Sequence, residues 1–144
     1  MSARTLSILG VTGSIGQSTI RVIEEMRAHG AEFEVEAITA GGNLPALVDA
    51  CQRLRPRFAA IADPSLLAPT REALSGLDIV VGAGQSALEE AGARPADWVM
   101  SAIVGAAGLA PTMAAVRRGA VVALANKECL VCAGPLFIAA AKAH

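Results

Sequence analysis

The chain has 144 residues, of which 53% are hydrophobic and 17% are charged, so it is apolar enough to form a folded core. The 12 basic and 13 acidic residues give a formal net charge of −1 with no basic run, and aromatic residues make up only 3%. This composition argues against nucleic-acid binding and against electrostatic docking to a membrane. Glycine and proline also interrupt the most apolar stretch before it reaches the roughly 20 residues of a membrane-spanning helix.

Short apolar runs alternate with longer amphipathic stretches along the whole chain. The apolar runs predict strands at residues 5–10, 33–39, 58–62, 78–81, 98–102 and 121–125. The stretches that follow them predict helices at residues 15–29, 44–55, 64–74, 86–91, 111–118 and 128–143. Such alternation indicates a parallel sheet with helices on both faces. We therefore predict an α/β fold, a doubly wound parallel sheet of the Rossmann type, with residues 1–144 as one domain of about six β-α units.

Several single residues carry local expectations. Ser14 is placed to cap the first helix and Gly30 to end it. Asp63 precedes a proline, the order typical of a helix start. Trp98 is expected in the core.

A glycine-rich turn, ILGVTGSIGQS, joins the first strand to the first helix. Gly10 permits the tight turn, Gly13 lets a pyrophosphate approach the backbone, and Gly16 lets helix and strand pack closely. The free amides of the helix N-terminus, with the hydroxyls of Thr12 and Ser14, are suitable donors for phosphate. This context predicts a dinucleotide site, and the alternative is a turn of small residues without a ligand.

The end of the second strand bears on the choice between NAD and NADP. NAD sites usually carry Asp or Glu there to hold the ribose 2′-hydroxyl, whereas this chain has Gly41, Gly42 and Asn43, and Glu36 comes too early. We therefore favour NADP, with a 2′-phosphate held by turn amides and Asn43, although the turn itself contains no Arg or Lys. Asn43 is also a candidate helix cap, and both roles are compatible.

Two later segments each leave alternatives open. The loop SAIVGAAGLAPT follows the fifth strand, and its small residues suit either a flat ring such as nicotinamide or an ordinary connection. Cys129 and Cys132 form a CxxC motif, which can be a redox pair or part of a metal site. The bulky residues between them and the lack of a second such motif favour buried structural thiols. An odd number of cysteines, 3, suggests reduced thiols in the cytoplasm.

Three segments resemble the 1-deoxy-D-xylulose 5-phosphate reductoisomerase family. They are GVTGSIG (10–16), SAIVGAAGLAPTMAAVRRG (101–119) and LANKECLV (124–131), in the family's order and spacing. The resemblance covers essentially the whole chain but only the family's N-terminal NADPH-binding domain. Family members convert 1-deoxy-D-xylulose 5-phosphate to 2-C-methyl-D-erythritol 4-phosphate in the non-mevalonate isoprenoid pathway, using NADPH.

The resemblance implies a role for each matching residue. Those implied to bind NADPH are Thr12, Gly13, Ser14, Ile15, Gly41, Gly42, Asn43, Asn126 and Glu128. Lys127 matches a substrate-binding position. Two residues depart from the family pattern, because many members have Lys in place of Gly42 and Ser in place of Cys129. The first departure removes a cation from the 2′-phosphate site.

The resemblance also implies what this chain lacks. The family's Mg²⁺ or Mn²⁺ ligands, its catalytic domain and its C-terminal domain are expected beyond residue 144, so we expect neither a catalytic residue nor a metal ligand here. The chain alone should bind NADPH without turnover, and the full-length enzyme should be a cytoplasmic homodimer. Two alternatives remain: a cofactor domain like that of homoserine dehydrogenase, which shares the Ala-Asn-Lys motif, and a non-catalytic nucleotide-binding module.

Overall fold

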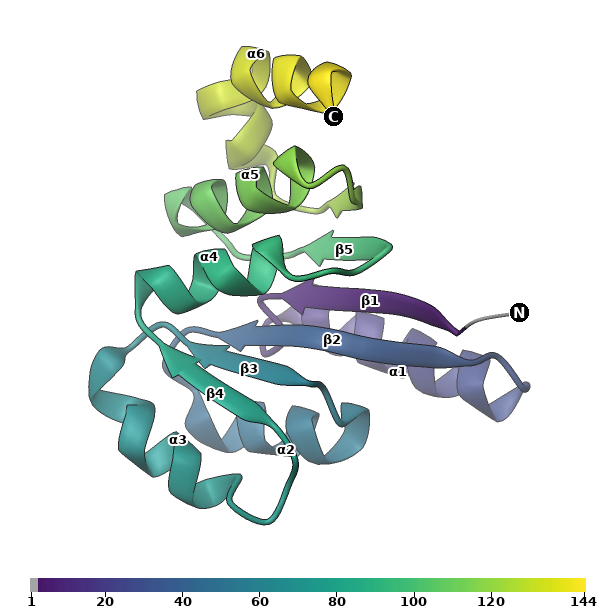
Figure 1. Ribbon diagram of the computed structural model, residues 1–144, viewed down its shortest axis with the longest axis vertical. Helices are drawn as coiled ribbons and strands as arrows, with labels where there is room; N and C mark the ends of the chain where they lie inside the picture. Colours follow the sequence, from purple (N-terminus) through teal and green to yellow (C-terminus); the bar gives the residue numbers. More distant parts are fainter. Residues whose placement is uncertain (1–2) are drawn as a thin grey trace.

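The computed structural model describes residues 3–144, in which six strands alternate with helices (Figure 1). The strands are β1 (Arg4–Leu9), β2 (Phe33–Ala40), β3 (Phe58–Ile61), β4 (Val80–Ala83), β5 (Trp98–Ser101) and β6 (Val121–Leu124). The helices are α1 (Ser14–Ala28), α2 (Leu44–Leu54), α3 (Leu67–Ala73), α4 (Gln85–Ala93), α5 (Leu109–Arg117) and α6 (Lys127–Ala143). Two 3₁₀ turns, η1 (Pro64–Leu66) and η2 (Ala106–Gly108), precede α3 and α5.

All six strands are parallel and form one sheet in the order β4-β3-β2-β1-β5-β6. The chain therefore builds outward from β1 to β4, crosses back, and continues from β5 on the other side of β1. This confirms the predicted doubly wound sheet. The reversal of strand order between β1 and β5 opens a crevice at the carboxyl ends of these strands, where open α/β sheets bind ligands.

The core lies on both faces of the sheet. In Figure 1, α1 and α2 lie behind the sheet and α4 lies in front of it. Alternate residues of β1 point to opposite sides, with Ile8 buried under α1 and α2 and Leu9 buried on the side of α4. The strands are thus apolar on both faces, as the continuous apolar runs predicted. Within residues 3–144, no helix combines the length and hydropathy needed to cross a bilayer.

The ends of most predicted elements shift by one or two residues in the structure, and two of these differences have a clear structural reason. The fourth strand begins at Val80, where its pairing with Phe58 of β3 starts. The preceding residues 77–79 form a turn instead, because the Ile79 amide donates to the Leu77 carbonyl at 2.9 Å. The helix predicted for residues 64–74 is divided into η1 and α3. The Asp63 cap itself is confirmed, since its carboxylate accepts from the Ser65 amide at 2.9 Å.

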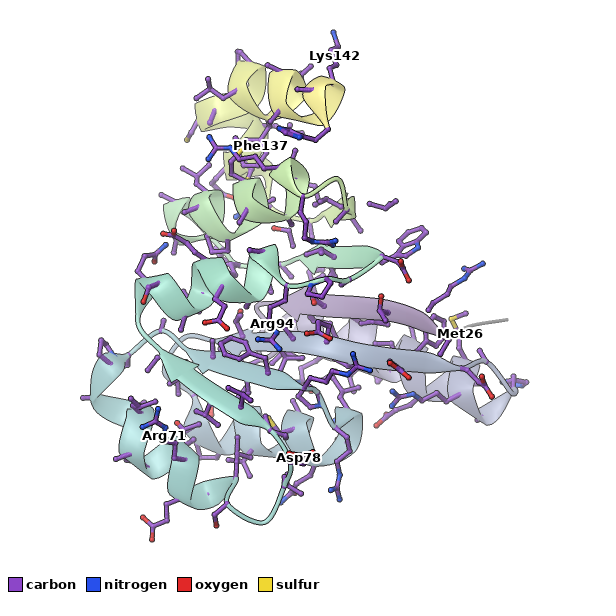
Figure 2. The ribbon with its side chains drawn as sticks, in the orientation of Figure 1. Met26, Arg71, Asp78, Arg94, Phe137 and Lys142 are labelled. Carbon is purple, nitrogen blue, oxygen red and sulfur yellow. The ribbon has the colours of Figure 1, made fainter. Side chains whose placement is uncertain are left out.

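The last helix is bent. Ala133 has non-helical backbone angles (φ −140°, ψ 24°) two residues before Pro135. Proline has no amide hydrogen and its ring collides with the preceding turn, so an uninterrupted helix over residues 128–143 is a wrong prediction. Beyond the bend, α6 packs on α5 through Phe137, which is 5% exposed and points toward α5 in Figure 2.

Trp98 was expected in the core, and that expectation is wrong. Its side chain is 47% exposed at the start of β5. It borders an apolar groove between α1 and the sheet, together with Met26 and Met100. Because α6 packs on α5 rather than over this face, no helix of the described residues 3–144 covers β5 and β6 on the side of α1.

An ion-pair cluster around the buried Glu36 joins β2 to the end of α4. Glu36 is the extra residue of a β-bulge, since Val35 pairs with Leu6 and Ala37 pairs with the next residue, Ser7. Although Glu36 is 3% exposed, its carboxylate accepts from Arg94 Nε at 2.8 Å. Figure 2 shows Arg94 over the front face of the sheet.

The same carboxylate also accepts from Arg57 Nη1 at 3.4 Å. The Arg94 guanidinium stacks 4.8 Å from the Phe58 ring centroid and pairs with Glu90. The Glu36 carboxylate is therefore bound by Arg57 and Arg94 and does not lie at the end of β2. This agrees with the inference that Glu36 comes too early in the strand to bind a ribose.

Candidate functional site

The crevice predicted by the strand order contains two adjoining cavities at the carboxyl edge of the sheet. The strand arrowheads of β1, β2 and β5 point to this edge, on the left in Figure 1. The first cavity, about 310 Å³, is lined by Gly10, Thr12, Gly13, Thr39, Ala40, Gly41, Ala62, Leu88, Ala102, Ile103, Val104 and Ala107. The second, about 200 Å³, is lined by Ile15, Ala102, Ile103, Val104, Ala125, Asn126, Lys127 and Glu128. The shared residues 102–104 make the two cavities neighbours along one edge.

Two glycines fix the shape of the loop after β1. Gly10 has φ +87°, and a Cβ there would lie 2.7 Å from the Ala102 carbonyl oxygen. A Cβ at Gly16 would overlap the carbonyl oxygens of Gly10 and Val11. Both positions therefore require glycine for backbone geometry and close packing, as the predicted roles of Gly10 and Gly16 assumed.

Gly13 differs from its two neighbours because packing does not require it. Its φ of −77° suits any residue, and beyond the adjoining residues the nearest described atom to a Cβ there is the Gly10 carbonyl oxygen at 3.9 Å. Gly13 is exposed, lines the first cavity, and is the N-cap of α1 without a side-chain hydrogen bond. The amides of the first turn thus have no side-chain cap, which is the arrangement that accepts a phosphate.

The structure corrects the expected cap of α1. Ser14 is the first helical residue, and Gly13 has the extended backbone of an N-cap, so the Ser14 hydroxyl lies within the first turn. Thr12, Ser14 and Ile15 nevertheless surround the uncapped helix end together, with Ser14 and Ile15 exposed and Thr12 partly exposed. The phosphate-binding residues predicted from the glycine loop are therefore grouped at one place.

The turn after β2 is open. Among residues 3–144, apart from the immediate chain neighbours, no atom lies within 4 Å of a Cβ placed at Gly41 or Gly42. The Asn43 side chain caps α2 by accepting from the Ala46 amide at 3.1 Å. The cap role predicted for Asn43 is thus confirmed. A ligand can approach the backbone of this turn without displacing a side chain.

The fold also brings an acidic residue to this turn, which sequence reasoning did not foresee. The Asp63 amide donates to the Gly41 carbonyl at 3.3 Å. The hydroxyl and amide of Ser65 donate to the Asp63 carboxylate and hold its pKa below the usual value, so the group is charged at neutral pH. Asp63 therefore contacts the turn through its backbone, while its carboxylate is held by Ser65.

The second cavity brings Lys127 and Glu128 close to the glycine loop through Ile15. Lys127 is exposed and makes no ion pair within residues 3–144. Its ammonium group is therefore available to a ligand at the sheet edge. Glu128 is partly exposed, and its backbone amide donates to Asn126 Oδ1 at 2.9 Å.

Asn126 is 3% exposed and uses its whole side chain within the protein. Its Oδ1 atom caps α6 by accepting from the Glu128 amide. Its Nδ2 group donates to the carbonyls of Ile103 and Gly105, the latter at 3.1 Å. Asn126 thus links the end of β6 to the loop after β5.

Two further residues of the site were not found from the sequence. Thr39 is buried at the end of β2, and its Oγ1 accepts from the Gly10 amide at 2.8 Å, which ties the glycine loop to the neighbouring strand. Gly108 is buried in η2, where a Cβ would overlap Asn126 Nδ2. A hydroxyl at the end of an apolar strand was a usable signal for Thr39, whereas Gly108 depends on a contact 18 residues along the chain from it.

The CxxC motif is divided between two environments. Cys129 is buried at the start of α6, whereas Cys132 is exposed, so the expectation of two buried thiols is wrong for Cys132. Burial raises the pKa of Cys129, and it raises the pKa of Cys51 to about 12. All three cysteines are free thiols. Within residues 3–144, no three His, Cys, Asp or Glu side chains lie close enough together to hold a metal ion.

We expect only Cys132 to react with a maleimide in the native protein at neutral pH. Burial excludes the reagent from Cys51 and Cys129 and suppresses their thiolates. Mass spectrometry of labelled peptides, with and without urea, measures this directly. A Cys132→Ser variant serves as the control and should lose the rapid labelling. Rapid native labelling of Cys51 would contradict the described burial.

The family model of 1-deoxy-D-xylulose 5-phosphate reductoisomerase matches residues 6–134. The chain is 55% identical over 140 residues to the reductoisomerase of Rhodopseudomonas palustris strain TIE-1, covering 97% of this chain and 34% of that protein. It is 50% identical over 141 residues to that of Rhodospirillum centenum, covering 98% and 34%. The chain therefore spans about a third of the length of these relatives.

Solved structures agree with this comparison. The reductoisomerase from Zymomonas mobilis in complex with NADPH superposes with a TM-score of 0.94 at 48% identity, covering 99% of this chain and 37% of that one. A reductoisomerase in complex with NADPH, fosmidomycin and magnesium gives a TM-score of 0.90 at 38% identity, covering 98% and 34%.

Proposed function

The chain belongs to the 1-deoxy-D-xylulose 5-phosphate reductoisomerase family, and on this premise we propose that residues 1–144 form the NADPH-binding domain of such an enzyme. The main support for the proposal is the arrangement of residues at the carboxyl edge of the sheet. There an uncapped helix N-terminus, an open glycine turn and a loop of small residues line two adjoining cavities. These residues fit a dinucleotide phosphate, ribose and flat ring.

Each part of the edge has a proposed role. The amides of Thr12, Gly13, Ser14 and Ile15 hold the pyrophosphate at the positive end of α1. Gly41, Gly42 and Asn43 hold the phosphorylated adenosine ribose. The loop after β5 and the start of α6, including Asn126 and Glu128, receive the nicotinamide end. NADPH supplies a hydride when bound, and the protein's task here is to hold it in one orientation.

The activity of the whole enzyme is also part of the proposal. We propose that the whole enzyme, of which a chain such as this spans about a third, converts 1-deoxy-D-xylulose 5-phosphate to 2-C-methyl-D-erythritol 4-phosphate. We infer that Mg²⁺ or Mn²⁺ ligands and the catalytic domain come from the remaining two thirds of such a protein. Lys127 contributes a cation toward the phosphosugar, and the whole enzyme is a cytoplasmic homodimer.

Calorimetric titration with NADPH and with NADH tests the proposed function. We expect saturable one-to-one binding of NADPH, and a preference over NADH of less than about tenfold, because the turn at residues 41–43 lacks a cation. Addition of 1-deoxy-D-xylulose 5-phosphate and Mg²⁺ should cause no oxidation of NADPH by this chain. A folded chain that binds neither nucleotide would overturn the proposal.

A further inference from the structure

The loop between β5 and α5 has little regular secondary structure of its own to fix its conformation. Residues 102–105 have no regular secondary structure, and Gly105 has φ +80°, a conformation that most residues avoid. Val104 is 85% exposed. Yet residues 102–104 line both cavities of the candidate site. The shape of this loop therefore decides the shape of the site.

The side chain of Asn126 provides the missing support. It comes from the neighbouring strand end, lies beneath the loop, and donates to the Ile103 and Gly105 carbonyls. The loop closes around it at Gly108, where a side chain would collide with the Asn126 amide group. Because the amide is 3% exposed, water does not replace these hydrogen bonds readily.

We propose that Asn126 is a positioning residue that holds the β5–α5 loop in the form that receives the nicotinamide end of the cofactor. The choice of cofactor rests on the proposed function, whereas the support of the loop rests on the hydrogen bonds alone. Helix capping is a separate role of the same side chain, since it uses Oδ1 and not Nδ2.

An Asn126→Asp variant separates the two roles. Asp caps helices as well as Asn does, so α6 keeps its N-cap. At pH 8, however, the carboxylate has no hydrogen to donate to Ile103 and Gly105 and repels both carbonyl oxygens. Gly108→Ala tests the same contact from the loop side, because its methyl group must displace the Asn126 amide. Both variants should therefore loosen the loop.

Two ligands distinguish a local effect from general damage to the fold. Under the proposed function NADPH extends into both cavities, whereas 2′-phospho-ADP-ribose lacks the nicotinamide and meets the β5–α5 loop only where the loop borders the first cavity. In each variant we expect NADPH to bind about tenfold more weakly. Binding of 2′-phospho-ADP-ribose should change less than twofold. Equal loss for both ligands, or no loss for either, would overturn the positioning role.

Hydrogen exchange in the cofactor-free chain tests the loop independently of the ligand. In Asn126→Asp we expect the amide hydrogens of residues 103–108 to exchange faster than in the parent chain. The control is Asp63→Asn, which also interchanges a carboxylate and an amide, but at the N-cap of η1. In this control the amide hydrogens of residues 103–108 should exchange as in the parent chain. If the parent chain binds no NADPH, the proposed function fails and this exchange still decides the role of Asn126. Unchanged exchange of the loop in Asn126→Asp would refute it.

Discussion

A Gly13→Ala variant is expected to fold nearly as stably as the parent chain and to bind NADPH at least about tenfold more weakly. The backbone of Gly13 suits alanine, and apart from the adjoining residues its methyl group would meet no described protein atom closer than 3.9 Å. Exchanging glycine for alanine at an N-cap costs at most about 1 kcal/mol. The same methyl group would, however, stand on the exposed side of the helix end where a pyrophosphate must approach the amides.

Gly16→Ala provides the contrast within the same loop. Its methyl group would overlap the Gly10 and Val11 carbonyl oxygens, so the glycine loop must shift or the helix must move away. Overpacking of this kind against the backbone should lower the free energy of unfolding by about 3 kcal/mol.

Urea unfolding and NADPH titration of both variants measure the two effects separately. The expected pattern is loss of affinity with retained stability for Gly13→Ala, and loss of stability for Gly16→Ala. Unchanged NADPH affinity in Gly13→Ala would show that the pyrophosphate does not lie at this helix end.

The second large effect lies far from the candidate site. We expect Glu36→Gln to lower the free energy of unfolding by about 2–3 kcal/mol, because the change removes the charge that balances Arg94 in a buried setting. Arg94 keeps its pair with Glu90 and is 26% exposed, so the loss should fall below that of a fully buried pair. Urea unfolding at neutral pH gives the value.

Glu34→Gln is the matched control for that variant. Glu34 pairs with Arg57 at 2.6 Å, but both side chains are more than half exposed, so its removal should cost less than about 1 kcal/mol. NADPH affinity should remain unchanged in Glu36→Gln, since the cluster lies outside both cavities. Equal destabilisation by the two substitutions would contradict the importance of burial in this cluster.

Much of the fold follows from local pattern. Continuous apolar runs separated by amphipathic stretches are enough to predict a parallel sheet with helices on both faces, because each strand must be covered twice. What the pattern misses depends on distant partners. Trp98 has the sequence context of a core strand, yet its exposure is decided by where α6 packs. The bend of α6 had a local signal, Pro135, that the predicted helix did not take into account.

In the candidate site, too, features with a local sequence pattern could be predicted, whereas features that depend on distant partners could not. The glycine loop is recognisable from spacing in the context of a strand and a helix, because its backbone geometry is local. Asp63 and Gly108 are not recognisable in this way. The fold places Asp63 beside Gly41 and Gly108 beside Asn126, and each residue matters to the site only through that contact. Ser14 was predicted to be the N-cap of α1, but the N-cap is Gly13. Which of two neighbouring residues is the cap depends on the backbone angles of one residue, and the sequence does not give these angles.

Amide chemical-shift mapping with NADPH tests the central claim most directly. In a ¹⁵N-labelled chain, the proposed site predicts saturable shifts at residues 12–15, 41–43, 102–108 and 126–128, all along one edge of the sheet. The groove beside Trp98 and Met26, on the α1 side of the sheet, should remain unchanged. Shifts confined to that groove, or no saturable shifts in a folded chain, would contradict the assignment of this edge as the NADPH site.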